Sequence, residues 1–250
     1  MKYGLIGEKL GHSYSKRIHE AMRQEAYELK ELSREEFPEF MKERAFAGIN
    51  VTIPYKQAVI PYLDRLDDAA ARIGAVNTVV CRDGELWGYN TDYYGFAETL
   101  HENRIDVAGR KVLVLGNGGA AKAVLAVFED EGAGSVLTVK YKREPGCLTY
   151  EEAACAHADA DVIVNTSPVG MFPNCDASPM SLTPYKNLCA VCDLIYNPPV
   201  TRLLSDAAAQ GAAAVNGLRM LVLQAKKASE LFFGDVLPME AADKIYGELL

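Results

Sequence analysis

The chain has 250 residues, 49% hydrophobic and 24% charged, a composition typical of a folded globular protein rather than a disordered one. Its formal net charge is −8, which argues against a nucleic-acid partner, because such partners usually require a basic protein face. No apolar run reaches the ~18 residues of a membrane span, and the N-terminal one is too short for a signal-peptide core. We therefore expect one or two domains, a cytoplasmic location and no membrane partner.

The first half of the chain alternates short apolar runs with amphipathic stretches. Strands are expected over residues 2–6, 27–32, 48–52, 75–81 and 86–89. Helices are expected over residues 16–25, 34–44, 56–63 and 67–73. Between the last two strands, Asp83-Gly84 is a hairpin turn signal. This alternation predicts an α/β domain with a mostly parallel sheet.

A helix over residues 93–104 is expected to lead into a second unit. Five strands are expected there, over residues 111–115, 136–139, 161–165, 189–194 and 212–215, with helices between them, the first over 120–130. This arrangement predicts a Rossmann-like dinucleotide-binding domain. Two further helices are expected over residues 217–233 and 239–249. The cleft between the two domains is the natural ligand site.

A glycine-rich loop follows the strand expected at 111–115. It reads Gly116-Asn117-Gly118-Gly119-Ala120-Ala121 and fits the pattern G-x-G-x-x-A. Gly116 would permit a tight turn, Gly118 would let the backbone approach a pyrophosphate, and Ala121 would let the helix pack closely. The helix N-terminus would offer free N–H groups to the anion. A turn without a ligand is the alternative, but the strand–loop–helix context favours nucleotide binding.

The residues after the next strand indicate which nucleotide binds. An NAD site has Asp or Glu there to hold the ribose hydroxyls. Here the strand is followed by Lys140, Lys142 and Arg143, and the first acid is Glu144. Three cations in four residues suit the 2′-phosphate of NADP, and an exposed charged loop is the alternative. The sequence thus predicts NADP (NADPH).

Three polar clusters fall at expected strand ends in the first half, where an α/β sheet presents ligand-binding side chains. They read Gly11-His12-Ser13-Tyr14-Ser15, then Asn50-Val51-Thr52-Ile53-Pro54-Tyr55-Lys56, then Asn77-Thr78 with Asn90-Thr91-Asp92. Together they supply hydroxyls, amides, one ammonium and one carboxylate. Such a set would bind a small polyhydroxylated molecule that carries a carboxylate.

Each of these residues also has a structural reading. Ser15 or Asp92 could cap the helix that follows it, and Ser13 could serve a turn. Lys56 is harder to explain in this way, because the dipole disfavours a cation at a helix start. Lysine and aspartate together suggest proton transfer between a carbonyl and an alcohol, with Lys56 giving the proton in one direction and taking it in the other.

The cysteines and histidines do not indicate a metal site. Only Cys189 and Cys192 form a C-x-x-C, inside an apolar run, and no second pair or H-E-x-x-H is present. Buried strand cysteines are the expected reading, with no bound metal.

The motifs GHSYS, GINVTIPYK, GAVNT, GYNTDYYGF, GNGGAA, VNTSPVGM, DLIYNPP and NGLRMLVLQA resemble, in this order, those of shikimate dehydrogenases. The resemblance implies a substrate domain over residues 1–93, completed by helices in 220–250, and an NADP-binding domain over 94–219. It implies NADPH-dependent, reversible reduction of 3-dehydroshikimate to shikimate in aromatic amino-acid (chorismate) biosynthesis.

The resemblance also implies roles for single residues. Lys56 and Asp92 would be catalytic. Substrate would be bound by Ser13, Ser15, Asn50, Thr52, Asn77, Tyr196 and Gln224. Cofactor would be bound by Gly116, Asn117, Gly118, Gly119, Ala120, Ala121, Lys140, Lys142, Arg143, Thr166, Ser167, Gly217 and Met220.

The chain departs from the family in its first motif, where Lys16 replaces a usual proline and Glu20 a usual asparagine, and at two places on the cofactor side. The adenosine-side Asn-Arg-Thr motif is absent, with Lys140 to Arg143 near its place, and Arg219 replaces a common glycine. Two alternatives stay open: a shikimate/quinate dehydrogenase that uses NAD or NADP, and a non-catalytic NADP-binding sensor. A small-molecule substrate is expected, with a monomer or a homodimer.

Overall fold

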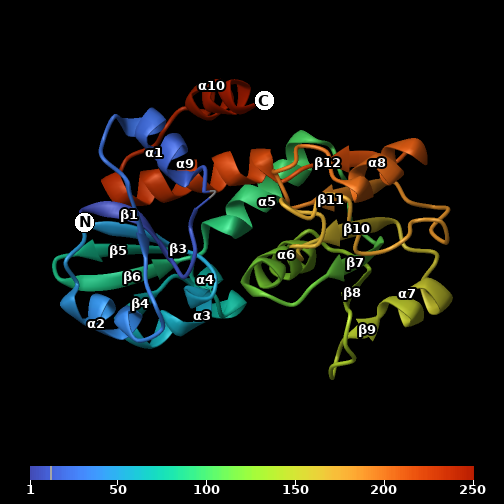
Figure 1. Ribbon diagram of the computed structural model, residues 1–250, viewed down its shortest axis with the longest axis horizontal. Coiled ribbons are helices and arrows are strands. Elements are labelled where there is room, and N and C mark those ends of the chain that lie inside the picture. The colour runs from blue at the N-terminus through green and yellow to red at the C-terminus, as the bar shows by residue number, and fades with distance from the viewer. Residues whose placement is uncertain (12) are drawn as a thin grey trace. The chain divides into compact units, whose positions relative to one another are not determined.

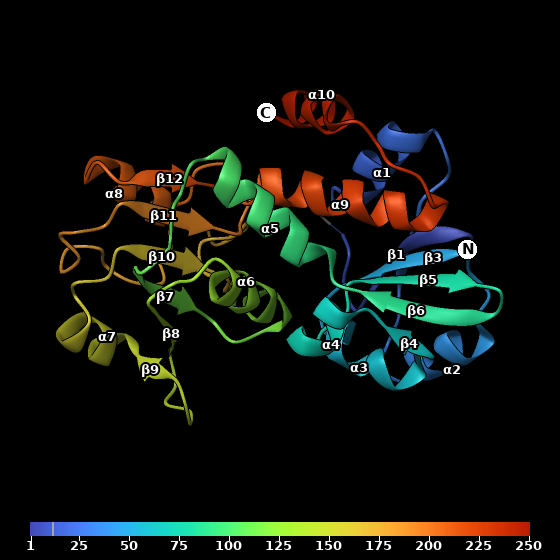
Figure 2. The same cartoon turned by 180° about the vertical axis from the view of Figure 1, so that it is seen from behind.

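The chain folds into two compact units. The computed structural model describes residues 1–11 and 13–250, so His12 of the first polar cluster lies outside the described residues. One unit comprises Met1–Gly95 with Leu221–Leu250, and the other comprises Phe96–Met220. Each contains a six-stranded sheet flanked by helices (Figures 1 and 2). The chain leaves the first unit within α5 (Thr91–Glu102) and returns to it within α9 (Leu218–Phe233).

The sheet of the first unit has the strand order β2-β1-β3-β5-β6-β4. Its strands are β1 (Tyr3–Gly7), β2 (Glu28–Glu31), β3 (Gly48–Val51), β4 (Arg65–Leu66), β5 (Thr78–Arg82) and β6 (Glu85–Tyr89). Among the described strands, β1 is parallel to β2 and β3, and β4 to β6, whereas β5 is antiparallel to β3 and β6. The α/β class with a mostly parallel sheet is confirmed. The short strand β4 is an addition to the predicted set.

The hairpin between β5 and β6 forms where Asp83-Gly84 predicts it. Asp83 has φ of 52° and Gly84 has φ of 83°. Two successive residues at positive φ are what a tight two-residue hairpin turn needs, since its twist matches that of the flanking strands. The hairpin makes β6 antiparallel to β5, so the carboxyl end of β6 lies beside the amino end of β5.

The helices of the first unit cover both faces of its sheet. They are α1 (Ser15–Arg23), α2 (Glu36–Glu43), α3 (Tyr55–Ala58), α4 (Asp68–Ile73), most of α9, and α10 (Met239–Leu249). One face of the sheet, which includes Ile6 and Ile49, packs on α2 and α3, whereas the alternate residues Leu5 and Val80 pack with Phe232 of α9. Successive strand residues point to opposite faces, so two cores result.

The single helix expected over residues 56–63 is wrong. The α-helix α3 ends at Ala58, and a 3₁₀ helix, η1 (Ile60–Tyr62), follows. Pro61 has no N–H to donate, so the regular helical ladder cannot continue through it. Lys56 therefore stands on a helix of one turn, next to the sheet edge.

The second unit has a fully parallel sheet in the order β12-β11-β10-β7-β8-β9. Its strands are β7 (Lys111–Leu115), β8 (Ser135–Lys140), β9 (Leu148–Thr149), β10 (Val162–Asn165), β11 (Ala190–Asp193) and β12 (Ala213–Val215). Its remaining helices are α6 (Gly119–Asp130), α7 (Tyr150–Ala156) and α8 (Arg202–Ala209). This is the Rossmann strand order, with β7 and β10 at the point where the order reverses. Five strands were expected, and the described residues add the two-residue β9.

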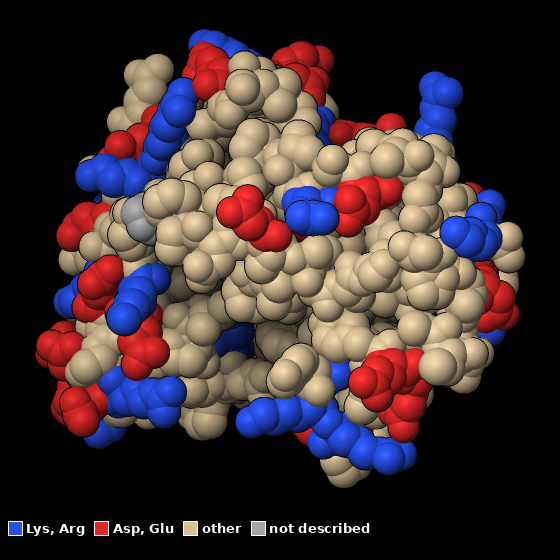
Figure 3. Space-filling model, turned by 45° about the vertical axis from the view of Figure 1, so that its right-hand side comes forward, with Lys and Arg blue, Asp and Glu red and all other residues tan. Residues whose placement is uncertain are grey.

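Two further properties are the distribution of surface charge and the apolar character of the helices. On the face drawn in Figure 3, basic and acidic side chains lie side by side. Within residues 1–11 and 13–250, no helix has both the length and the apolar character needed to cross a membrane.

Candidate active site

Three strand ends meet at one edge of the first unit's sheet. Because β5 runs antiparallel to both β3 and β6, its amino end lies beside their carboxyl ends. Lys56 follows β3, Asn77 precedes β5 and Asp92 follows β6. The topology therefore gathers three polar residues that are distant in the sequence.

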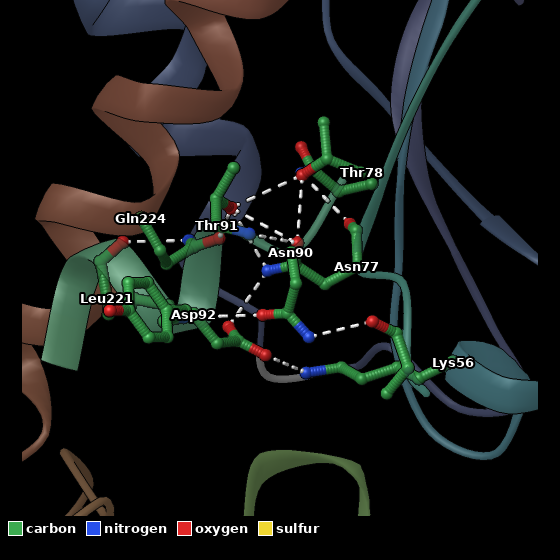
Figure 4. Close-up of polar contacts among 11 residues, drawn as sticks. Lys56, Asn77, Thr78, Asn90, Thr91, Asp92, Leu221 and Gln224 are labelled. Atoms are coloured by element: carbon green, nitrogen blue, oxygen red, sulfur yellow. Dashed lines mark hydrogen bonds and ion pairs between the residues drawn. The ribbon is translucent and has the colours of Figure 1, made fainter. Parts of the chain in front are cut away.

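Lys56 and Asp92 form an ion pair at this edge (Figure 4). Lys56 Nζ lies 2.5 Å from Asp92 Oδ2. The two side chains are only 15% and 9% exposed, so solvent screens their attraction weakly. Desolvating two charges is costly, and each of them here compensates the other.

Asn77 holds the second oxygen of the Asp92 carboxylate. Its Nδ2 donates to Asp92 Oδ1 at 2.9 Å and to Thr91 Oγ1 at 3.0 Å. Its Oδ1 accepts from the backbone N–H of Thr91 at 2.7 Å. Asn77 is 3% exposed and all of these contacts are buried, so the amide fixes the start of α5 and the direction of Asp92.

Asp92 is not a helix cap. It is the second residue of α5, and the Oδ1 of Asn90 accepts from the N–H of Tyr93 at 3.3 Å, as a capping side chain does. The reading of Asp92 as a cap is wrong, because Asn90 has that position. The carboxylate is free to face Lys56, and its place in the first turn suits an anion.

The hydrogen-bond network continues from Thr91 to α9. Thr91 Oγ1 lies 3.2 Å from Thr78 Oγ1 and donates to Gln224 Oε1 at 3.4 Å. Gln224 Nε2 donates to the carbonyl of Leu221 at 2.8 Å. Gln224, which residue type alone does not single out, thus belongs to the same cluster as Lys56 and Asp92.

The side chain of Asn50 is held by Tyr27, whose ring packs on His19. Tyr27 donates to Asn50 Oδ1 at 2.7 Å, and the Tyr27 ring stacks on His19 with centroids 4.1 Å apart. The Nδ2 of Asn50 donates to the Asn77 carbonyl and to Thr78 Oγ1. Both amide hydrogens are therefore used, and only the second lone pair of Oδ1 is left for a ligand.

The two serines and Thr52 lie near the ends of β1 and β3. Ser13 Oγ accepts from the N–H of Ser15 at 3.2 Å, which is the turn expected for it. Ser15 is 8% exposed and is the first residue of α1, whose start has no side-chain cap, so the reading of Ser15 as a cap is wrong. Thr52 directly follows β3, and its N–H donates to the carbonyl of Ile6 at 2.9 Å.

The glycine-rich loop of the second unit has the geometry of an anion site. Gly116 has φ of 113°, which favours glycine, and Gly118 has open space where a Cβ would stand. Helix α6 begins at Gly119, one residue earlier than expected, and no side chain caps it. Ala121 is fully buried against the sheet. Exposed Asn117 and half-buried Ala120 complete the loop. These residues fit a dinucleotide pyrophosphate.

The cations at the end of β8 and directly after it are largely paired with acids. Lys140 forms an ion pair with Glu144, and Arg143 lies 3.1 Å from Glu152. Lys142 is exposed and forms no ion pair within the described part of the chain. The three cations therefore lie close together in the chain, but Lys140 and Arg143 are already paired with acids, whereas Lys142 is not.

Buried polar residues organise the loops after β10 and β11. Asp193 accepts from Thr201 Oγ1 at 2.7 Å and from Asn165 Nδ2 at 3.0 Å. Asn165 Oδ1 in turn accepts from Ser167 Oγ at 2.7 Å, and Thr166 Oγ1 donates to the carbonyl of Leu115 at 2.8 Å. Burial raises the pKa of Asp193 to about 6, against the hydrogen bonds that lower it.

The remaining predicted residues also belong to the second unit. Tyr196 is half-buried after β11, and Met220 is 7% exposed on α9. A Cβ on Gly217 would lie 2.0 Å from the carbonyl oxygen of Leu194, so only glycine fits there. Arg219 turns to Glu102, with two contacts of 2.6 Å.

No group of three potential metal ligands occurs in residues 1–11 and 13–250. Cys192 is buried in β11, whereas Cys189 is half-buried and its Sγ lies 3.1 Å from the carbonyl oxygen of Asp161. The C-x-x-C cysteines thus pack as strand and strand-edge residues.

Sequence reasoning missed several members of the site. Thr78 and Thr91 stood in the polar clusters without a stated role, whereas His19 and Tyr27 carried no signal at all. Asp193 stood only inside a motif. A charged residue at the end of an apolar strand is a signal that could have drawn attention to it.

Comparison with known proteins gives a consistent result for both units. A protein-family model described as the shikimate dehydrogenase substrate binding domain matches residues 5–79. The shikimate dehydrogenase (NADP(+)) of Clostridium beijerinckii is 41% identical over 247 residues, which cover 92% of this chain and 91% of that relative.

Solved structures agree over the whole length. Shikimate dehydrogenase 1 from Peptoclostridium difficile is 39% identical with a TM-score of 0.90, over 100% of this chain and 98% of that one. Shikimate 5-dehydrogenase from Thermus thermophilus, in complex with NADP(H) and shikimate, is 32% identical with a TM-score of 0.88, over 100% of both chains.

The buried imidazole of His19 should make the folded protein less stable at acidic pH. Burial lowers the pKa of His19 to about 3, below the ~6.5 of an unfolded chain. The unfolded state then binds more protons between these values, so stability is lost as pH falls through this window. Between pH 7 and 5 the wild type should lose about 2 kcal/mol more than His19→Phe, measured by urea unfolding. If wild type and His19→Phe lose the same stability between pH 7 and 5, His19 is not the cause of the acid sensitivity.

The buried carboxyl of Asp193 should have the opposite effect, a loss of stability as the pH rises. Its pKa of about 6 lies above the ~3.9 of an unfolded chain, so the native state binds the extra proton and stability falls as pH rises from 4 to 6. Relative to Asp193→Asn, the wild type should lose about 2 kcal/mol over that range. Urea unfolding of both proteins at pH 4 and pH 6 measures this loss. If wild type and Asp193→Asn show the same pH dependence, the raised pKa of Asp193 does not affect stability.

Proposed function

The chain belongs to the shikimate dehydrogenase family, and we propose that it catalyses the NADPH-dependent, reversible reduction of 3-dehydroshikimate to shikimate in the chorismate pathway. The observation that carries the proposal is the shielded Lys56–Asp92 ion pair. It stands in a unit whose sequence matches a substrate-binding family model, beside amides and hydroxyls that suit a polyhydroxylated ligand.

The first unit is proposed to bind the substrate. Ser13 and Ser15 would hold its carboxylate through their hydroxyl groups. Thr52, Asn77 and Gln224 would face its hydroxyl groups, and Asn50 would contribute its remaining lone pair. For Asn50, Asn77 and Gln224, the buried hydrogen-bond network supports the assignment, since it fixes the directions of these three side chains before a ligand arrives.

Lys56 is proposed to move the proton in the reaction. As the carbonyl oxygen gains negative charge, the Lys56 ammonium donates a proton to it and the hydroxyl forms. In the reverse direction the neutral amine removes the hydroxyl proton. Asp92, 2.5 Å away, holds the amino group in place and stabilises its charged form. Asn77 keeps that carboxylate turned toward Lys56.

The second unit is proposed to bind NADP. The phosphate loop from Gly116 to Ala121 would hold the pyrophosphate, and Lys140, Lys142 and Arg143 would lie at the adenosine end. Thr166, Ser167, Tyr196, Gly217 and Met220 would lie toward the nicotinamide, with Tyr196 also near the substrate. When bound, NADPH supplies the hydride that reduces the carbonyl carbon.

Other properties stay predictions from the sequence. These are a cytoplasmic location, the absence of a nucleic-acid partner and a monomeric or homodimeric state. The boundaries of the two functional domains, at residues 93 and 219, belong to the same proposal. The units divide after Gly95 and Met220.

A substrate and cofactor panel tests the function. We expect NADP⁺ reduction with shikimate, measured by absorbance at alkaline pH, because the proposed reaction is reversible. Faster turnover with quinate would favour a shikimate/quinate dehydrogenase. Tight NADPH binding without turnover on either substrate would leave a non-catalytic sensor and overturn the proposal.

Replacing Lys56 tests the proton-transfer role. Lys56→Ala should lower kcat by ~10²–10⁴-fold, the usual contribution of a positioned acid or base. Circular dichroism should show an unchanged fold. Lys42→Ala is the matched control, since Lys42 is exposed on α2. A kcat within twofold of wild type for Lys56→Ala would contradict the role of this residue.

A further inference from the structure

The loop after β8 brings an acid to the glycine-rich loop. The carboxylate of Glu144 pairs with Lys140, and its Oε2 accepts from Asn117 Nδ2 at 3.3 Å. Asn117 directly follows Gly116, the first glycine of the phosphate loop. Glu144 thus connects the end of β8 with the loop that is proposed to hold the pyrophosphate.

The same carboxylate reduces the positive charge of the basic segment. Lys140 is neutralised by Glu144, and Arg143 is paired with Glu152 at 3.1 Å. Glu152 is itself held in place, because it forms the capping box of α7 with Thr149. Of the three cations in residues 140–143, Lys142 is the one without an ion pair in the described part of the chain.

The position of Glu144 matters for the adenosine ribose. In dinucleotide-binding folds, an acid after the second strand accepts a hydrogen bond from the ribose 2′-hydroxyl of NAD. A 2′-phosphate at the same place carries negative charge, so it is repelled by a carboxylate and attracted by cations. The segment here carries both kinds of group, within four residues of each other.

We propose that Glu144 sets the balance between the two cofactors in this protein, by accepting from the ribose 2′-hydroxyl of NADH and by opposing the 2′-phosphate of NADPH. Lys142 acts in the other direction and attracts that phosphate. The protein therefore binds NADH as well as NADPH, with a modest preference for NADPH. This inference rests on the proposed assignment of the second unit as the nucleotide-binding one.

Direct titration of NADPH and NADH, followed by nucleotide fluorescence without substrate, tests the proposal. Glu144→Gln keeps the length of the side chain and should tighten NADPH binding about tenfold, while NADH binding stays equal or weakens. Lys142→Gln should weaken NADPH alone. Glu151→Gln, an exposed acid in the first turn of α7, is the matched control and should change neither constant.

An equal change for both nucleotides in Glu144→Gln would overturn the proposal. So would a wild-type preference for NADPH above about a thousandfold, because such a preference leaves no room for an opposing acid. Glu144 is 43% exposed, so its replacement leaves the fold intact, and thermal melting verifies this. A protein that binds both nucleotides as expected but oxidises no shikimate would disprove the proposed function and leave this inference standing.

Discussion

The contact between the Lys56 ammonium and the Asp92 carboxylate is the interaction on which the proposed chemistry depends. Two charges that are largely removed from water are stable together only when their remaining hydrogen-bonding capacity is also satisfied. Asn77 does this for Asp92, and Thr91 and Gln224 extend the network toward α9. Removing one partner would leave the other charge uncompensated. The first unit can keep this pair because its sheet, its hairpin and α9 hold every donor in place.

The fold explains why these groups meet. One antiparallel strand, β5, sits between β3 and β6, so the residues after β3 and β6 and the residue before β5 share one edge. The second unit uses a different device, the reversal of strand order in a parallel sheet, to expose its glycine-rich loop. Each unit thus gathers the residues proposed to bind ligands at the ends of its strands.

Much of this could be predicted, because local patterns decide it. The glycine-rich loop and the Asp-Gly hairpin need special backbone angles that few other sequences supply. Residue type singled out Lys56 and Asp92, but their contact follows from strand order, which periodicity does not give. Gln224 came only from the family resemblance. The contact of Tyr27 with Asn50 and that of Glu144 with Asn117 depend on tertiary packing, so no sequence pattern indicated them.

A double-mutant cycle tests the central claim most directly. It compares kcat/KM for wild type, Lys56→Met, Asp92→Asn and the double variant. If the two groups act as one unit, the double variant should be about as slow as the slower single variant, because removing the ammonium leaves the carboxylate nothing to position. Multiplication of the two single losses would show that the residues act independently and would contradict the account.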